Sequence, residues 1–129
     1  PPMKLLLDTH AFLWLVAGDR RLSPTARRAL EGPKAQPLLS LASVWELAIK
    51  SSLGRLTLPE PLDTYLAKKL ATNLRLLSVD LSHVVAVERL PCHHQDPFDR
   101  LLVAQALTER LPIVTRDREI RKYGVEVIW

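Results

Sequence analysis

The hydrophobic residues of this chain fall into short unbroken runs that alternate with longer stretches of mixed character. Such short runs predict strands of a parallel sheet, because these strands are covered on both faces. Strands are expected at residues 3–7, 36–40, 74–79, 112–115 and 125–129. Between them the pattern predicts helices at residues 9 or 10 to 17, 24–32, 41–53, 62–72, 82–89 and 97–110, followed by a helical turn at 118–123.

The predicted helices carry end signals that fit these positions. Ser23-Pro24 and Asp96-Pro97 each supply an N-cap residue followed by proline at the first helical position. Gly18 and Gly54 follow the ends of two helices, where glycine is the favoured C-cap. Alternation of strands and helices predicts an α/β fold with a mainly parallel five-stranded sheet and helices on both faces. Right-handed crossovers then bring the carboxyl ends of the strands to one edge.

Four acidic residues are expected near that edge. Asp8 follows the first strand, and Asp117 lies two residues beyond the fourth. Glu46 lies in the helix after the second strand, and Asp99 lies in the first turn of the helix before the fourth. Carboxylates that meet at one place repel each other unless cations bind. Mg²⁺ and Mn²⁺ prefer carboxylate oxygen, so the pattern favours a divalent metal site and phosphate chemistry.

Three of the aspartates also have a purely structural explanation. Asp8 can cap the first helix, and Asp96 is predicted to cap the helix that begins at Pro97. Asp99 then falls at the third helical position, where an acid complements the helix dipole.

The remaining two acids have structural alternatives as well. Glu46 and Lys50 are spaced for an ion pair on the helix surface. However, Ser43 lies on the same side, so Glu46 belongs to a polar stripe whose members can orient it. Asp117, between two arginines, can be a solvated turn residue.

The chain length and composition fit one packed domain. The 129 residues are enough for a single core, and 47% of them are hydrophobic. The domain is expected to span residues 3–129, since Pro1-Pro2 before Met3 look like residues left from recombinant expression. The single cysteine, Cys92, excludes an internal disulfide framework. No apolar run approaches the ~18 residues needed to span a bilayer, so a cytoplasmic protein without membrane contact is expected.

The distribution of charge along the chain indicates the kind of substrate. The chain has 18 Lys and Arg against 14 Asp and Glu, a net charge of +4. Setting the four candidate acids aside leaves about eight positive charges in excess on the rest of the protein. A basic body around an acidic pocket favours a nucleic acid, although a solvated basic surface would look the same in the sequence.

The segments around the four acids resemble those of PIN-domain proteins, and within that family the VapC-type toxins of bacterial toxin–antitoxin pairs. The resemblance extends over essentially all of residues 3–129. It rests on Leu-Leu-Leu-Asp8-Thr-His, Ser-Val-Trp-Glu46-Leu-Ala-Ile-Lys50, His94-Gln-Asp96-Pro-Phe-Asp99-Arg and Val-Thr-Arg-Asp117, in that order. The Asp-Pro-Phe-Asp-Arg segment is the most specific of them.

This resemblance implies a PIN-like domain that is a metal-dependent endoribonuclease, using Mg²⁺ or Mn²⁺ to activate a water molecule. Asp8 and Asp99 would be the principal metal ligands, and Glu46 and Asp117 would complete the site. Supporting roles would fall to Thr9, Ser43 and Thr115 beside the acids, to Asp96 through a hydrogen bond to a metal-binding residue, and to Arg100 and Arg116 as candidate contacts to RNA phosphate.

The resemblance also implies partners. VapC-type proteins usually form homodimers and are inhibited by a cognate VapB-type antitoxin. The antitoxin lays a segment in an apolar groove and commonly points a basic side chain into the acidic site. His93 and His94, next to Cys92, match no zinc spacing. His94 belongs to the segment that carries the resemblance, which implies a loop or substrate-side role for it.

Other classes of protein fit less well. A receiver domain would need adjacent acids after the first strand, where Asp8 stands alone. A haloacid-dehalogenase-type phosphatase would need a second aspartate at the position of His10. A catalytically silent PIN-like module that binds RNA or a protein remains the main alternative, and the presence of all four acids argues against it.

Overall fold

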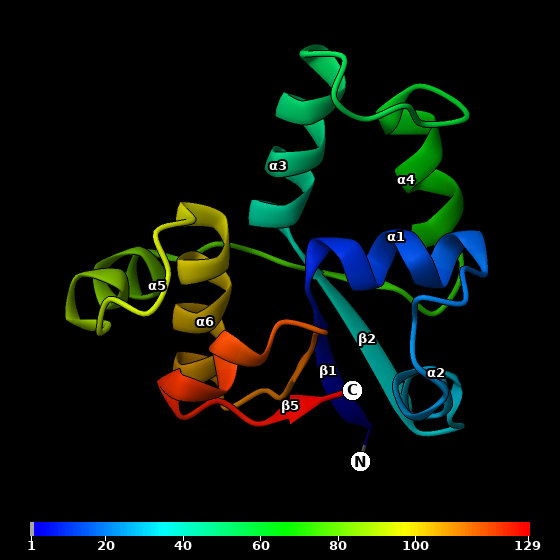
Figure 1. Cartoon of the computed structure of the whole chain (residues 1–129). Helices are drawn as coiled ribbons and strands as arrows, with labels where there is room; N and C mark the ends of the chain where they lie inside the picture. Colours follow the sequence, from blue (N-terminus) through cyan, green and yellow to red (C-terminus); the bar gives the residue numbers. More distant parts are fainter. Residues whose placement is uncertain (1) are drawn as a thin grey trace.

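Parallel strands form the centre of the protein, whose computed structural model describes residues 2–129 (Figure 1). The sheet has five strands in the order β3-β2-β1-β4-β5, and every neighbouring pair is parallel. Their bounds are β1 (Met3–Leu7), β2 (Ala35–Ser40), β3 (Arg75–Leu77), β4 (Ile113–Val114) and β5 (Val127–Ile128). The predicted α/β class and parallel sheet are thus confirmed. Pro1, expected to be left from expression, lies outside the described residues.

Helices cover both faces of this sheet. They are α1 (Thr9–Ala17), α2 (Pro24–Glu31), α3 (Leu41–Ser52), α4 (Leu62–Leu70), α5 (Leu81–Ala86) and α6 (Pro97–Glu109), with 3-10 helices η1 (Val87–Arg89) and η2 (Arg118–Tyr123). In Figure 1, α1 and α2 lie on one side of the strands and α5 and α6 on the other. Among the residues described, no helix combines the length and apolar character that crossing a bilayer requires.

The central strand β1 divides the core into two clusters. Leu5 and Leu7 pack in a cluster that includes Phe12 of α1, whereas Leu6 packs in a second cluster with Leu102 of α6. All three leucines of β1 are fully buried. Side chains that alternate between two covered faces explain why the run reads as continuously hydrophobic in the sequence.

Several predicted elements are shorter in the structure. β3, β4 and β5 are contained within the predicted ranges 74–79, 112–115 and 125–129. β3 and β5 are edge strands, and each pairs with one neighbour only. Each of these strands is therefore limited to the residues that pair with that neighbour. The helix predicted at 82–89 divides into α5 and η1, and the helix predicted at 62–72 ends at Leu70.

The register of the sheet defines the edge that carries the candidate acids. Leu7 pairs with Leu39 of β2 and with Val114 of β4, so β1, β2 and β4 end at nearly the same level. Asp8 therefore stands beside Thr115, the residue after β4. Because α1 and α3 begin directly after β1 and β2, this edge also gathers two helix N-termini.

Candidate active site

Asp8 lies at the carboxyl end of β1, where it both caps α1 and faces the site. Its Oδ1 accepts the Ala11 N–H at 2.7 Å, and its Oδ2 accepts the Thr115 hydroxyl at 2.5 Å. Only 9% of Asp8 is exposed. Burial raises the pKa of Asp8 above its ordinary value, against the lowering effect of the two hydrogen bonds. The expected cap and the expected site residue are therefore the same side chain.

Glu46 comes from the first half of α3 and points into the protein, with 6% of the residue exposed. Its Oε1 accepts the Thr9 hydroxyl at 2.6 Å, and its Oε2 lies 2.7 Å from the Lys50 ammonium. The Thr9 and Ser43 hydroxyl oxygens are 3.0 Å apart, so the polar stripe of α3 meets the start of α1. The predicted ion pair with Lys50 is present, and it does not draw Glu46 into solvent.

Asp99 carries the clearest sign of crowded negative charge. It lies in the first turn of α6. Asp96 is the N-cap of this helix, as predicted, and its Oδ1 accepts the Phe98 and Asp99 N–H groups. Burial raises the pKa of Asp99 to about 7, with further increases from the charges of nearby carboxylates. In decreasing order, those carboxylates are Asp96, Asp8 and Glu46. Carboxylates from three distant parts of the chain therefore act on one another at this edge.

Asp117 contacts His94, for which the sequence predicted a loop or substrate-side role and no contact with an acid. Its Oδ2 lies 2.7 Å from Nε2 of His94, and its Oδ1 accepts the Glu119 N–H at 2.9 Å. Partial burial works to raise the pKa of Asp117, but these hydrogen bonds outweigh it and leave the pKa below its ordinary value. Ligand atoms of His94, Asp99 and Asp117 all lie within 4.8 Å of one another. Asp8 and Glu46 fall outside this tight group.

The contact between His94 and Asp117 could not be predicted from the sequence. His94 lies in a loop without hydrophobic periodicity, and its partner Asp117 is 23 residues away. Its place in the segment that resembles PIN-domain proteins was the only available signal. The expected loop position is correct, and the ring faces the acids.

The two arginines expected to contact phosphate differ from each other. The Arg100 guanidinium donates to backbone carbonyls, at 2.9 Å for Pro91 and 3.2 Å for Val87. Arg100 therefore fastens the loop before α6, and the structure does not support a phosphate-binding role for it. Arg116 is exposed, and its guanidinium lies over the Trp14 ring at 4.7 Å from the centroid. It also lines a pocket that includes Asp117, Arg118 and Arg121.

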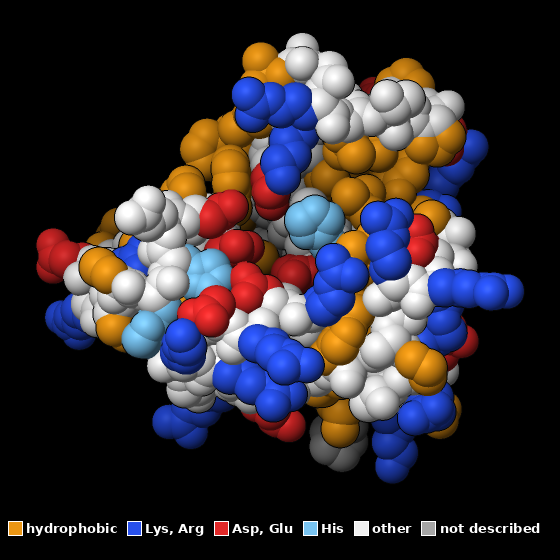
Figure 2. Space-filling view, viewed as in Figure 1, with side chains coloured by type: hydrophobic (Ala, Val, Ile, Leu, Met, Phe, Trp, Pro, Cys, Tyr) orange, Lys and Arg blue, Asp and Glu red, His pale blue; other side chains and the backbone are white. Residues whose placement is uncertain are grey.

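The space-filling view shows how these charges are distributed (Figure 2). Red carboxylates gather in a central hollow together with pale-blue histidine, and blue lysine and arginine side chains surround them on several sides. Hydrophobic side chains form a separate patch next to this hollow. The exposed surface therefore combines an acidic centre with a basic border, as expected from the charge balance.

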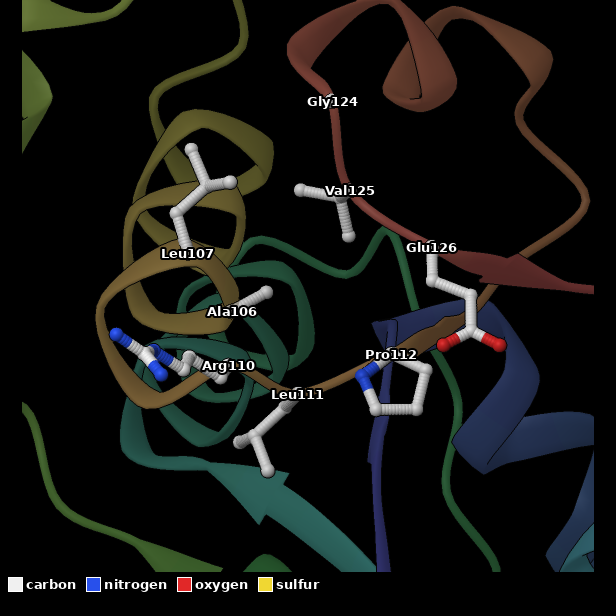
Figure 3. A pocket seen from close by; sticks show the side chains of 8 residues that line it. All are labelled: Ala106, Leu107, Arg110, Leu111, Pro112, Gly124, Val125 and Glu126. Carbon is white, nitrogen blue, oxygen red and sulfur yellow. The ribbon is translucent and has the colours of Figure 1, made fainter.

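Not every hollow of the protein has this chemistry. The pocket in Figure 3 lies between the end of α6 and the residues that precede β4 and β5, at the opposite edge of the sheet. Its lining is mainly apolar, and its two charged side chains, Arg110 and Glu126, are exposed. It brings together no group of carboxylates.

A second group of potential ligands lies at the far end of α6. Ligand atoms of Asp80, His83 and Glu109 are within 4.8 Å of one another. Nδ1 of His83 accepts the Asp80 N–H at 3.0 Å, which places the ring proton on Nε2, 3.3 Å from Glu109. A nitrogen that carries a proton cannot bind a metal ion, so this group is saturated by its own hydrogen bonds.

The first group, by contrast, fits a divalent cation. Besides the His94 ring, it offers carboxylate oxygens of Asp99 and Asp117, which hard cations such as Mg²⁺ and Mn²⁺ prefer. Burial raises the pKa of Asp99, and the charges of Asp96, Asp8 and Glu46 raise it further. Asp99 and Asp117 are close enough to share a cation, which would offset this repulsion, and Asp8 and Glu46 are near enough to act on Asp99 electrostatically.

Comparison with known proteins shows which family the sequence matches. A family model for the PIN domain matches residues 5–126. The chain is similar to Ribonuclease VapC22 of Mycobacterium tuberculosis, with 34% identity over 121 residues that cover 92% of this chain and 91% of the relative.

Two solved structures show the same fold. One is the crystal structure of VapBC2 from Rickettsia felis bound to a DNA fragment from their promoter, with a TM-score of 0.72, 13% identity and 97% of each chain covered. The other is DNA-bound VapBC from Salmonella typhimurium, with a TM-score of 0.68, 16% identity and coverage of 97% of this chain and 96% of that one. At these identities the likeness concerns the fold alone.

Proposed function

This chain belongs to the PIN-domain family, and from that membership we propose that it is a VapC-type ribonuclease toxin that hydrolyses RNA phosphodiester bonds with divalent metal, in the cytoplasm. PIN nucleases are metal-dependent phosphodiester hydrolases. The observation that carries the proposal is the group of carboxylates at the carboxyl edge of the sheet, where burial, together with the neighbouring carboxylates, raises the pKa of Asp99 to about 7.

The proposed roles of the four acids differ with their surroundings. We assign Asp8 and Asp99 as the principal ligands of Mg²⁺ or Mn²⁺, with Glu46 and Asp117 completing the site. A metal held by these residues would supply an activated water and would stabilise the negative charge that develops on the phosphate. Thr115 holds Asp8 by its hydroxyl, and Thr9 holds Glu46 in the same way. These hydroxyl donors fix the carboxylate orientation before metal or RNA arrives.

Positive charge beside the acids supports RNA as the substrate. The pocket next to Asp117 is lined by Arg116, Arg118 and Arg121, all three exposed. Guanidinium groups bind phosphate oxygens through two hydrogen bonds at once, and this binding does not depend on base sequence. We propose that these arginines hold the RNA backbone next to the bond that is cleaved.

A groove on the other side of the site fits the expected antitoxin. It runs between α1, α3 and the segment before α4, and its lining includes apolar side chains of Leu13, Leu47 and Leu58. Thr9 and Lys50 line the same groove, so a segment bound there would lie next to Glu46. The solved relatives include toxin–antitoxin complexes. We propose that a VapB-type segment occupies this groove.

A homodimer is proposed from the exposed apolar surface of two helices. Leu81, Val84 and Val85 of α5 are more than half exposed, as is Trp45 of α3. Hydrophobic side chains clustered on a surface commonly mark a protein–protein interface. Light scattering on the purified protein should therefore give the mass of two chains, and a monomer mass at high concentration would refute the dimer.

Cleavage of RNA by the purified protein is the test of the proposed activity. Total bacterial RNA is incubated with Mg²⁺ or Mn²⁺, with and without EDTA, beside an Asp8→Asn variant. Metal-dependent cleavage that the variant has lost supports the proposal. Cleavage in EDTA, or full activity of Asp8→Asn, refutes the metal mechanism. Metal binding without cleavage of RNA would favour the alternative of a silent RNA- or partner-binding module.

A further inference from the structure

We infer that His94 is a positioning residue, which donates a hydrogen bond from Nε2 to Asp117 and thereby sets the geometry of the metal site without binding the metal itself. This inference rests on the proposed function of the acidic group. It concerns a side chain whose role neither the family resemblance nor the comparisons assign.

The loop that carries His94 is fastened on two sides. The His94 N–H donates to the Tyr123 hydroxyl of η2 at 2.8 Å. Arg100 of α6 donates to the Pro91 carbonyl at 2.9 Å and to the Val87 carbonyl at 3.2 Å. The loop therefore joins η2 to the start of α6, and these two elements carry Asp117 and Asp99.

The two ring nitrogens of His94 have different surroundings. Nε2 lies 2.7 Å from Oδ2 of Asp117, and only 10% of the side chain is exposed. Nδ1 is buried and has no hydrogen-bond partner among the residues that the structure describes. A proton on Nδ1 would thus be buried without an acceptor, which is costly, whereas a lone pair there costs less.

This asymmetry selects one tautomer of the ring. An ionised carboxylate only accepts hydrogen bonds, so Nε2 must carry the proton that it shares with Asp117. The nitrogen that faces the acids therefore has no free lone pair, and the other nitrogen, Nδ1, is buried away from them. Although His94 lies within 4.8 Å of Asp99 and Asp117, it has no free lone pair to offer a metal there.

This hydrogen bond orients Asp117, the N-cap residue of η2, whose side chain is 39% exposed. His94 holds one carboxylate oxygen, and the Glu119 N–H holds the other. Donors in this position fix a ligating carboxylate and typically alter metal affinity by about 10–100-fold. His94 therefore keeps Asp117 turned toward Asp99 instead of toward solvent.

Manganese binding by the purified protein in the absence of RNA tests the inference. His94→Phe retains a ring without a donor, whereas His94→Gln retains an N–H at a similar reach. Mn²⁺ affinity, measured from the EPR signal of the free ion, should fall about 10–100-fold in His94→Phe and less in His94→Gln. His93→Phe is the matched control, because His93 is exposed and contacts Tyr123 only through its ring edge.

A spectroscopic measurement separates positioning from a merely structural role. Long-range ¹H–¹⁵N spectra of the metal-free protein should show His94 with its proton on Nε2, and this signal should be absent from His94→Gln. A proton on Nδ1, or wild-type Mn²⁺ affinity in His94→Phe, would overturn the inference. If wild-type protein and Asp8→Asn both fail to bind Mn²⁺, the proposed function fails instead, and the tautomer still decides the role of His94.

Discussion

The two ends of α6 carry groups of similar composition and different electrostatics. At its start, His94 lies with Asp99 and Asp117, and at its end His83 lies with Asp80 and Glu109. Each histidine directs Nε2 toward one carboxylate, at 2.7 Å for His94 and at 3.3 Å for His83. By residue type and spacing alone, either group resembles a metal site.

The two groups differ in the charge that surrounds them. Asp80 and Glu109 are exposed, so water screens them, and the His83 ring is used in the cap of α5. The group at Asp99 instead adjoins Asp8 and Glu46, which are buried at the carboxyl edge of the sheet. We therefore propose the group at Asp99 as the functional one because buried carboxylates crowd around it, and not merely because ligand atoms are present.

Removing one acid from each group is expected to give the largest contrast. Asp99→Asn should lower RNA cleavage by more than about 100-fold, beyond the usual effect of residues that only support a ligand. Glu109→Gln should leave cleavage unchanged, because it alters a saturated group at the far end of α6. Initial cleavage rates at fixed Mn²⁺ measure both. Equal losses in the two variants would contradict the distinction.

The buried histidine of the second group should matter for folding instead. His83 is fully buried, and its Nδ1 accepts the Asp80 N–H at the start of α5. His83→Ala should reduce the free energy of unfolding by about 2–3 kcal/mol, through the lost hydrogen bonds and packing. Urea unfolding measures this loss. Mn²⁺ affinity of the folded variant should match that of the wild type, and a clear decrease would argue for a metal role at His83.

Thr115, the residue that follows β4, supports Asp8 beside the first group. Its buried hydroxyl donates to Oδ2 of Asp8, so Thr115→Val leaves that oxygen without its partner. Mn²⁺ affinity should fall by about 10-fold or more, as for other residues that orient a ligand. Thr115→Ser retains the hydroxyl and serves as the control. Isothermal titration of both variants gives the comparison, and unchanged affinity in Thr115→Val would show that Asp8 needs no such support.

The smallest expected effect is the pH dependence of the metal-free protein. Asp99 has a pKa of about 7 in the folded protein and an ordinary value of 3.8. Between these values the folded state binds more protons than the unfolded state, so Asp99 makes the protein less stable as pH rises toward 7.

Melting temperatures in EDTA from pH 5 to pH 8 test this expectation. The wild type should lose stability with rising pH, and Asp99→Asn should show a weaker decline. Excess Mn²⁺ should reduce or reverse the wild-type trend, because metal and proton compete for the same carboxylates. A decline that is identical in the wild type and in Asp99→Asn would show that the pKa of Asp99 is not raised.

Much of the acidic group could be expected from the sequence because it follows from chain topology. Parallel strands joined by helices end at one edge, so residues after separate apolar runs were expected to meet there. Asp8, directly after β1, is the clearest case. Asp96 was also predicted correctly as a cap, since Asp-Pro at a helix start is a local signal.

The features that the sequence did not reveal depend on contacts between irregular segments. His94 meets Asp117 across two loops, and no periodicity links their positions. The hydrogen bonds from Arg100 to the Pro91 and Val87 carbonyls could not be predicted for the same reason, because no sequence pattern indicates the path of that segment. The sequence also could not distinguish the Lys50 ion pair from a buried site position for Glu46, and the structure shows both.

The most direct test of the central claim is to locate manganese in a crystal of the protein by its anomalous scattering. We expect a peak bounded by the carboxylates of Asp8 and Asp99, at the edge of the sheet where β1 ends. We also expect Nε2 of His94 to remain hydrogen-bonded to Asp117 and not to contact the metal. A peak between His83 and Glu109, with none beside Asp8 and Asp99, would contradict the account.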